Sequence, residues 1–174
     1  MLGFVANSGT GKTTLLIRLI PLLAARGVRC AAIKHSHHDF DIDVPGKDSY
    51  RLRQAGARQV MLASPHRTFW IEEGDGHSEP RLGDLVARLD PTAIDLVLVE
   101  GFRDERLAKI EVHRPQPGTS LLCLEDPDVI AVASDVELDD PVSLPVLPLN
   151  VPAAVADFIV AWLRTSADRS AARR

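Results

Sequence analysis

The segment from Ala6 to Thr13, A-N-S-G-T-G-K-T, has the residue types and spacing of a phosphate-binding loop. Its glycines let the backbone curl so that successive N–H groups point at an anion, and the N-terminus of a following helix adds partial positive charge. Lys12 would reach the β and γ phosphates, and the Thr13 hydroxyl would complete the shell of a magnesium ion. The loop therefore predicts binding of a nucleoside triphosphate with Mg²⁺. The residues expected to contact the nucleotide here are Asn7, Ser8, Gly9, Thr10, Gly11, Lys12, Thr13 and Thr14.

Two positions of this loop narrow the class of protein. Ala6 stands where the usual motif has its first glycine. This change is tolerated because the position ends a strand and does not touch phosphate. Asn7 stands where one class of ATPases, those that dimerise around nucleotide, carries a second lysine. The signature-lysine ATPases are therefore disfavoured.

A carboxylate at the end of a buried strand would complete the nucleotide site. The run from Ile94 to Val99 is almost continuously apolar, which is typical of a strand covered on both faces of a parallel sheet, and Glu100 and Gly101 follow it directly. Ligands of open α/β sheets bind at the carboxyl ends of the strands. We therefore predict that Glu100 holds the metal or orients the attacking water, with Lys12 as the second catalytic residue. Gly101 would let the backbone approach the γ-phosphate.

The segment from Lys34 to Lys47, KHSHHDFDIDVPGK, is rich in histidine and aspartate. We interpret it as a nucleotide-responsive or substrate-binding loop. Metal binding, as in nickel-handling GTPases, and a solvated loop without chemistry remain open alternatives. The candidate contacts to a second ligand are Lys34, His35, His37, His38 and Lys47. Asp39 is the candidate metal ligand of this loop, with Asp41 and Asp43 as alternatives.

Three further cations, Arg51, Arg103 and Lys109, could bind an anionic second ligand, although solvent exposure is the preferred interpretation of each one. Asp135 follows the apolar run V-I-A-V-A-S. An aspartate at such a position in GTPases accepts two hydrogen bonds from guanine, an arrangement that adenine cannot match. The full Asn-Lys-x-Asp signature is absent, so a turn or capping role for Asp135 stays open.

These residues need an α/β framework to bring them together. An apolar run at 2–6, a helical pattern from 11 that stops at Gly27, and an apolar run at 28–34 predict a βαβ unit with a right-handed parallel crossover. Segments 58–64 and 68–73 predict an antiparallel hairpin. Helices are expected at 48–54, 82–89 and 151–163, and further strands at 108–113 and 129–133. The first strand begins almost at residue 1, which leaves open a native start further upstream.

The predicted fold is one P-loop domain with a mostly parallel twisted sheet, flanking helices and one antiparallel hairpin. We expect it to span residues 1–164, followed by a flexible polar tail at 165–174. The chain of 174 residues has 45% hydrophobic and 25% charged residues, as soluble globular proteins do, and its formal charge of −4 disfavours a general nucleic-acid binder. No apolar run is long enough for a bilayer, and two cysteines are too few for a disulfide framework or a zinc site. The expected location is the cytoplasm.

Four segments together resemble the MobB family, molybdopterin-guanine dinucleotide biosynthesis protein B, from residue 2 to about residue 163. These segments are NSGTGKTTLLIRLIPLLAARGVR, IKHSHHDFDIDVPGKDSYRLRQAGA, DLVLVEGF and VIAVASD. The resemblance implies a GTP-binding protein with weak GTPase activity that assists the MobA guanylyltransferase, which joins GMP to molybdopterin. It implies phosphate and magnesium binding at the P-loop, a second nucleotide motif at Glu100 and Gly101, and molybdopterin or the molybdenum cofactor as a candidate ligand. It also implies a homodimer, formed through the hairpin around residues 58–73.

Other functions remain open at this stage. A small-molecule P-loop kinase is one, although we find no clear lid with paired arginines. A histidine-rich metallochaperone GTPase is another. The third is a module that binds nucleotide without hydrolysing it and delivers cofactor or docks MobA. The leading interpretation is an accessory GTPase of molybdenum cofactor biosynthesis.

Overall fold

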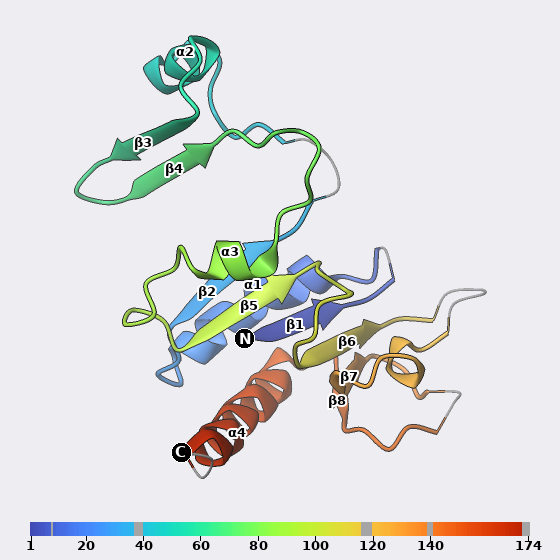
Figure 1. Ribbon diagram of the computed structural model, residues 1–174. Coiled ribbons are helices and arrows are strands. Elements are labelled where there is room, and N and C mark those ends of the chain that lie inside the picture. Colours follow the sequence, from blue (N-terminus) through green and yellow to red (C-terminus); the bar gives the residue numbers. More distant parts are fainter. Residues whose placement is uncertain (8, 37–39, 116–119, 139–140, 172–174) are drawn as a thin grey trace. The chain divides into compact units, whose positions relative to one another are not determined.

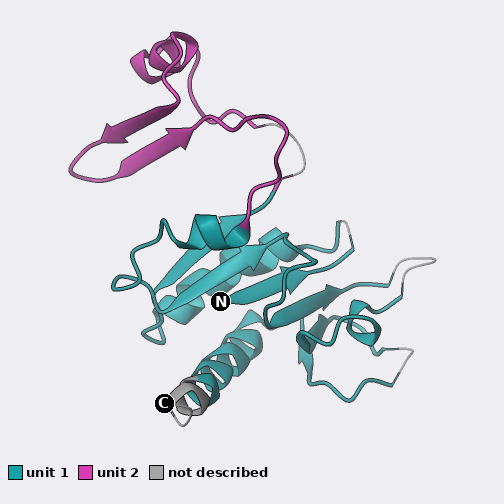
Figure 2. Ribbon diagram, in the orientation of Figure 1, with its two compact units in different colours: residues 1–35, 82–174 teal, residues 36–81 magenta. Residues whose placement is uncertain are grey.

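The computed structural model describes residues 1–7, 9–36, 40–115, 120–138 and 141–171. The chain forms two compact units (Figure 2). We call residues 1–35 together with the chain from residue 82 onward the P-loop unit, and residues 36–81 the hairpin unit. The hairpin unit is thus an insertion in the sequence of the P-loop unit, which the sequence analysis did not predict.

The P-loop unit contains a six-stranded sheet in the order β2-β5-β1-β6-β7-β8, in which every neighbouring pair is parallel (Figure 1). The predicted α/β fold is therefore confirmed. Because the strands are parallel, the carboxyl ends of β1, β2 and β5 lie at the same edge of the sheet. The strands are β1 (Leu2–Val5), β2 (Cys30–Lys34), β5 (Leu96–Glu100), β6 (Lys109–His113), β7 (Val129–Ser134) and β8 (Val146–Pro148). The helices are α1 (Lys12–Ala24), α3 (Leu82–Val86), the 3₁₀ turn η1 (Leu122–Leu124) and α4 (Pro152–Ala171).

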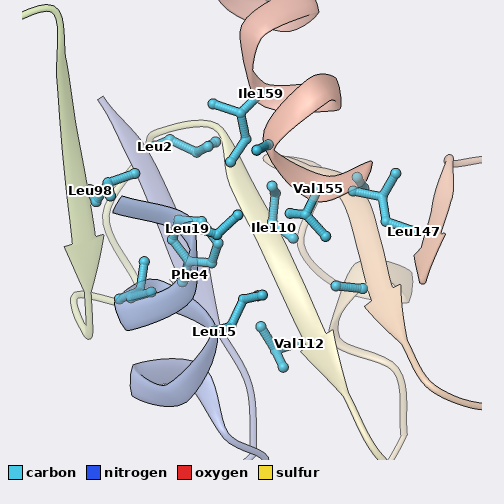
Figure 3. Close-up of a cluster of buried hydrophobic side chains, with 14 of the residues drawn as sticks. Leu2, Phe4, Leu15, Leu19, Leu98, Ile110, Val112, Leu147, Val155 and Ile159 are labelled. Atoms are coloured by element: carbon cyan, nitrogen blue, oxygen red, sulfur yellow. The ribbon is translucent and has the colours of Figure 1, made fainter. Parts of the chain in front are cut away.

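Alternating side chains of the strands form an apolar layer on each face of this sheet. Leu2 and Phe4 of β1 point to the face that packs against α1 and α4, where Leu19 is fully buried (Figure 3). Val5 contacts η1 on the opposite face, and Val99 packs there with α3. Truncation of a fully buried leucine such as Leu19 to alanine typically costs about 2–5 kcal/mol. This core fixes the position of α1. Because α1 is the helix that follows the P-loop, its N-terminus is fixed as well.

The hairpin unit contains α2 (Asp48–Gln54) and the antiparallel strands β3 (Gln59–Ala63) and β4 (Thr68–Glu72), so the predicted hairpin is confirmed. Its centre is Arg53, whose guanidinium bonds Asp43 at 3.0 Å, Glu73 at 2.8 Å and Asp41 at 3.1 Å. The Arg53 side chain is 12% exposed, and it also lies 5.8 Å from the ring centre of Tyr50. A charge cluster therefore joins the loop before α2 to α2 itself and to the end of the hairpin.

Several elements differ from the sequence prediction: η1 was not predicted, and α3 ends at Val86 instead of residue 89. Strand β8 was missed, because its three residues, which follow Pro145 and end at Pro148, give no alternation that a pattern can detect. Helix α4 continues to Ala171 instead of ending at residue 163. Its last residues include no glycine or proline that would stop a helix. Across the described part of the chain, none of the helices has the length and apolarity needed to cross a bilayer.

Candidate functional site

The P-loop lies between β1 and α1 with the geometry that its glycines predict. Gly9 and Gly11 have φ angles of 79° and 97°, in the left-handed region that glycine adopts without steric cost. Gly11 is the N-cap of the 13-residue helix α1 and offers no side chain to cap the free N–H groups of its first turn. Those groups and the helix dipole remain available for an anion. The Thr10 hydroxyl donates to the Asn7 carbonyl at 3.2 Å and closes the loop on itself.

Three side chains converge at the carboxyl end of β5. The Thr13 hydroxyl lies 2.7 and 2.9 Å from the two Glu100 carboxylate oxygens. The Lys34 ammonium donates to the Thr13 oxygen at 3.2 Å and lies 3.3 Å from Glu100 Oε1. Thr13 comes from the first turn of α1, Glu100 from the end of β5 and Lys34 from the end of β2, where Lys34 and Glu100 are paired in register. Two predicted metal ligands, Thr13 and Glu100, are thus brought together.

Lys12 lies next to this cluster. Its ammonium donates to the Ala6 carbonyl at 3.4 Å across the loop. Burial lowers the pKa of Lys12; the Glu100 carboxylate raises this pKa, and the Lys34 ammonium lowers it. Lys12 therefore shares the electrostatic environment of the other charged residues at the edge.

Close packing against His35 is a second requirement for glycine at position 101, in addition to the predicted approach to phosphate. Its φ is +93°, and a Cβ built on it would lie 2.7 Å from the His35 Cβ. The His35 backbone N–H donates to the Glu100 carbonyl at 2.8 Å, and its ring stacks on Phe102 with centroids 4.8 Å apart. The ends of β2 and β5 are therefore held together at Gly101. His35 is close to the nucleotide edge, as expected for the loop that it begins.

A pocket lies beside the P-loop on the side of β6 and β8. Asp135 is near it, because its carboxylate pairs with Arg114 Nε at 3.2 Å and Arg114 lines the pocket. Three residues of this pocket, Arg18, Arg114 and Asn150, were not predicted from the sequence. Asn150 follows β8, so its position at the strand edge could be inferred only once that strand was recognised. The pocket is lined by Thr10, Gly11, Thr14, Leu15, Arg18, Arg114, Leu149, Asn150 and Pro152.

The remaining predicted contacts separate into two groups. Ser8, His37, His38 and Asp39 lie outside the described residues. Asp41 and Asp43, the alternative metal ligands, are instead bound to Arg53 within the hairpin unit.

The other cations proposed as contacts to an anionic ligand have surroundings that differ from one residue to the next. Solvent exposure, the preferred interpretation of Lys109, was wrong, because its side chain is 2% exposed and pairs with Asp126 at 2.8 Å. Lys47 is exposed before α2, and Arg51 lies 3.7 Å from Asp48. Asp95, just before β5 and at the opposite end of that strand from Glu100, accepts two hydrogen bonds of 2.8 and 2.9 Å from the Arg29 guanidinium.

The donor set at the edge fits Mg²⁺ and a triphosphate. Magnesium prefers oxygen ligands, and a hydroxyl and a carboxylate meet beside a loop of backbone N–H groups and a lysine. Within the described residues no group of three or more His, Cys, Asp and Glu side chains forms a metal cluster. The chemistry that this edge can support is the binding of a nucleoside triphosphate with one divalent ion.

Comparisons with known proteins agree with the resemblance in the sequence. The family model MobB, molybdopterin guanine dinucleotide synthesis protein B, matches residues 1–135. The molybdopterin-guanine dinucleotide biosynthesis adapter protein of Escherichia coli K12 is 48% identical over 170 residues, covering 94% of this chain and 93% of its own. The adapter protein of Haemophilus influenzae is 44% identical, covering 94% and 89%. A crystal structure of molybdopterin-guanine biosynthesis protein B superimposes with a TM-score of 0.72 at 27% identity, covering 94% and 98%.

Proposed function

Because the chain belongs to the MobB family of molybdopterin guanine dinucleotide synthesis proteins, we propose that it is an accessory protein of molybdenum cofactor biosynthesis that binds GTP with Mg²⁺. The observation that carries the nucleotide part is the convergence of Thr13 and Glu100 beside the P-loop. The accessory part rests on relatives named adapter proteins, which match nearly the whole chain.

In this proposal each residue at the edge has a separate task. The N–H groups from Gly9 to Thr14 and the Lys12 ammonium would bind the phosphates, and Thr13 and Glu100 would hold the metal, directly or through water. Magnesium, when bound, neutralises charge on the β and γ phosphates. Glu100 would also orient the attacking water. The proposed activity is therefore a weak GTP hydrolysis that serves the accessory role.

The preference for guanine rests on Asp135. Its carboxylate lies at the carboxyl end of β7 and is paired with Arg114, a residue of the pocket beside the P-loop. Guanine N1–H and N2–H would donate hydrogen bonds to the Asp135 carboxylate in place of Arg114, whereas adenine offers no matching pair of donors. Competition between GTP and ATP on wild type and Asp135→Ala tests this assignment. We expect GTP to win on wild type by at least about tenfold and the difference to shrink in the variant; a wild type that prefers ATP would overturn it.

The hairpin unit would serve assembly. One face of the hairpin carries the cross-strand pair Met61 and Trp70, which are 66% and 44% exposed. Exposed apolar pairs of this kind mark protein–protein contacts, and we propose that they form a homodimer. A MobA-type guanylyltransferase is the proposed partner, with molybdopterin or the molybdenum cofactor as a further ligand. The proposed site of action is the cytoplasm, where the free thiols of Cys30 and Cys123 would stay reduced.

Lys12→Ala tests the nucleotide site most simply. We expect the affinity for a fluorescent GTP analogue with Mg²⁺ to fall about a hundredfold or more, because the lysine supplies a charge-assisted contact to phosphate. Arg106→Ala is the matched control, since it removes a cation that is 84% exposed and pairs with Asp128 in the same unit. Equal affinities of wild type and Lys12→Ala would refute nucleotide binding at the P-loop.

A further inference from the structure

The Lys34 ammonium lies where the Thr13 hydroxyl and the Glu100 carboxylate converge. It is 3.2 Å from Thr13 Oγ1 and 3.3 Å from Glu100 Oε1. A magnesium ion sits about 2.1 Å from its oxygen ligands. An ion held by these same two groups would therefore need the space that the ammonium fills, and two cations so close would repel each other strongly. We propose that Lys34 holds the magnesium position in the nucleotide-free protein and must leave it before a divalent ion can bind.

The backbone around Lys34 is fixed. Lys34 and Glu100 are register partners at the ends of β2 and β5. The next residue, His35, donates its backbone N–H to the Glu100 carbonyl at 2.8 Å and packs against Gly101. The two side chains therefore start from adjacent positions, and the lysine needs no rearrangement of the strands to reach the carboxylate.

The two partners differ in their freedom to move. The Glu100 side chain is 12% exposed, whereas the Lys34 side chain is 58% exposed. A nearly buried carboxylate without a cation is costly, because the protein replaces little of the water that would solvate it. Lys34 compensates this charge while remaining free to swing into solvent. The site thus combines a metal-binding carboxylate that is held in place, Glu100, with a cation that can move away, Lys34.

This exchange rests on the proposed function for its purpose but can be tested without nucleotide. Lys34→Met keeps the length of the aliphatic side chain and removes the ammonium from an exposed position, so the variant should fold normally. We expect Mn²⁺, followed by electron paramagnetic resonance on the nucleotide-free full-length protein, to bind Lys34→Met about fivefold more tightly than wild type. That factor is what an ion pair of this exposure can impose on a competitor.

Two further variants locate the effect. Glu100→Gln added to Lys34→Met should abolish the gain, because it removes the carboxylate ligand. Arg106→Met, which removes an exposed cation from its pair with Asp128, should bind Mn²⁺ as wild type does. If Lys34→Met gains no affinity, or gains it equally in the presence of Glu100→Gln, Lys34 and Glu100 form an ordinary surface ion pair and the proposal is wrong.

A second readout connects the exchange to nucleotide. In the absence of Mg²⁺ the Lys34 ammonium remains available to the β and γ phosphates, so wild type should depend less on the metal than Lys34→Met does. We expect the ratio of GTP affinity with Mg²⁺ to that with EDTA to rise at least about fivefold in the variant. An unchanged ratio contradicts the role of Lys34. A wild type that binds no GTP under either condition instead contradicts the proposed function, whereas the Mn²⁺ comparison would still stand.

Discussion

The P-loop unit and the hairpin unit are stabilised in different ways. The P-loop unit has an apolar core on both faces of a parallel sheet, and its functional polar groups gather at one edge. Among the described residues of the hairpin unit, Val60 is the buried apolar side chain, and ion pairs of Arg53 take the place of a core. The apolar residues that the hairpin unit exposes are Phe40, Ile42, Val44, Leu52, Met61, Leu62 and Trp70. The difference supports the proposal that the P-loop unit holds a ligand in fixed geometry and that the hairpin unit presents a surface for assembly.

The charge cluster of the hairpin unit offers the largest expected effect. Arg53→Met would leave Asp43, whose side chain is 7% exposed, without its cation, together with Asp41 and Glu73. We expect amide hydrogen exchange in residues 40–73 to accelerate about a hundredfold, while exchange in the P-loop unit stays unchanged.

Arg51→Met is the matched control, because Arg51 lies on the same helix and its side chain is 75% exposed. Equal acceleration in both units would show that they unfold together, and the comparison between them would then fail.

The junction at Gly101 tests how rigid the nucleotide edge is. Gly101→Ala places a methyl group 2.7 Å from the His35 Cβ and forces alanine to a φ of +93°. We expect a loss of about 2–3 kcal/mol in the free energy of unfolding, measured with urea. Gly83→Ala is the control, since a Cβ there meets nothing within 4 Å and its φ is not positive. If both variants lost the same stability, close packing at Gly101 would not matter.

The exposed face of the hairpin tests the proposed assembly role. Trp70→Glu places a charge in the centre of the proposed dimer interface, and we expect dimer affinity to fall about thirtyfold, as for the loss of one interface hot spot. Light scattering after size exclusion would follow the shift toward the 19.0 kDa chain. Ile17→Glu is the control, because Ile17 is 67% exposed on α1 of the P-loop unit. Dissociation by Ile17→Glu and not by Trp70→Glu would move the interface to the other unit.

The smallest expected effect concerns acid stability of the P-loop unit. The Arg29 guanidinium, through hydrogen bonds to the carboxylate, holds the pKa of Asp95 at about 2, below its usual 3.8. A folded pKa below the unfolded one stabilises the protein above about pH 4, and this contribution is lost as the pH falls toward 2. Both side chains are substantially exposed, so Asp95→Asn should lower Tm by about 2 °C or less at neutral pH. The difference from wild type should vanish near pH 2; a difference that grows on acidification would contradict this explanation.

Much of the P-loop unit could be predicted from the sequence because its signals are local. The glycines of the loop, the helical pattern of α1 and the apolar run before Glu100 each report a backbone requirement within a few residues. The meeting of Thr13 and Glu100 followed from the parallel topology, which places the strand ends at one edge.

Other features depend on contacts that no local pattern reports. Lys109 looked like a surface cation, yet β6 lies inside the sheet and Asp126 provides a partner from another segment. Asp41 and Asp43 looked like metal ligands because nothing nearby in the sequence marked Arg53 as their partner. The separation of the hairpin unit likewise follows from long-range packing, and no composition change marks its ends.

Hydrogen exchange with and without GTP and Mg²⁺ tests the central claim most directly, because it reports on both units in one experiment. We predict slower exchange at residues 9–16, at the end of β2 and around Gly101 when nucleotide binds. The hairpin strands β3 and β4 should be unchanged at a protein concentration where the dimer is fully formed. No protection at the P-loop, or protection mainly in the hairpin, would contradict the proposal that the P-loop unit holds GTP while the hairpin unit provides the assembly surface.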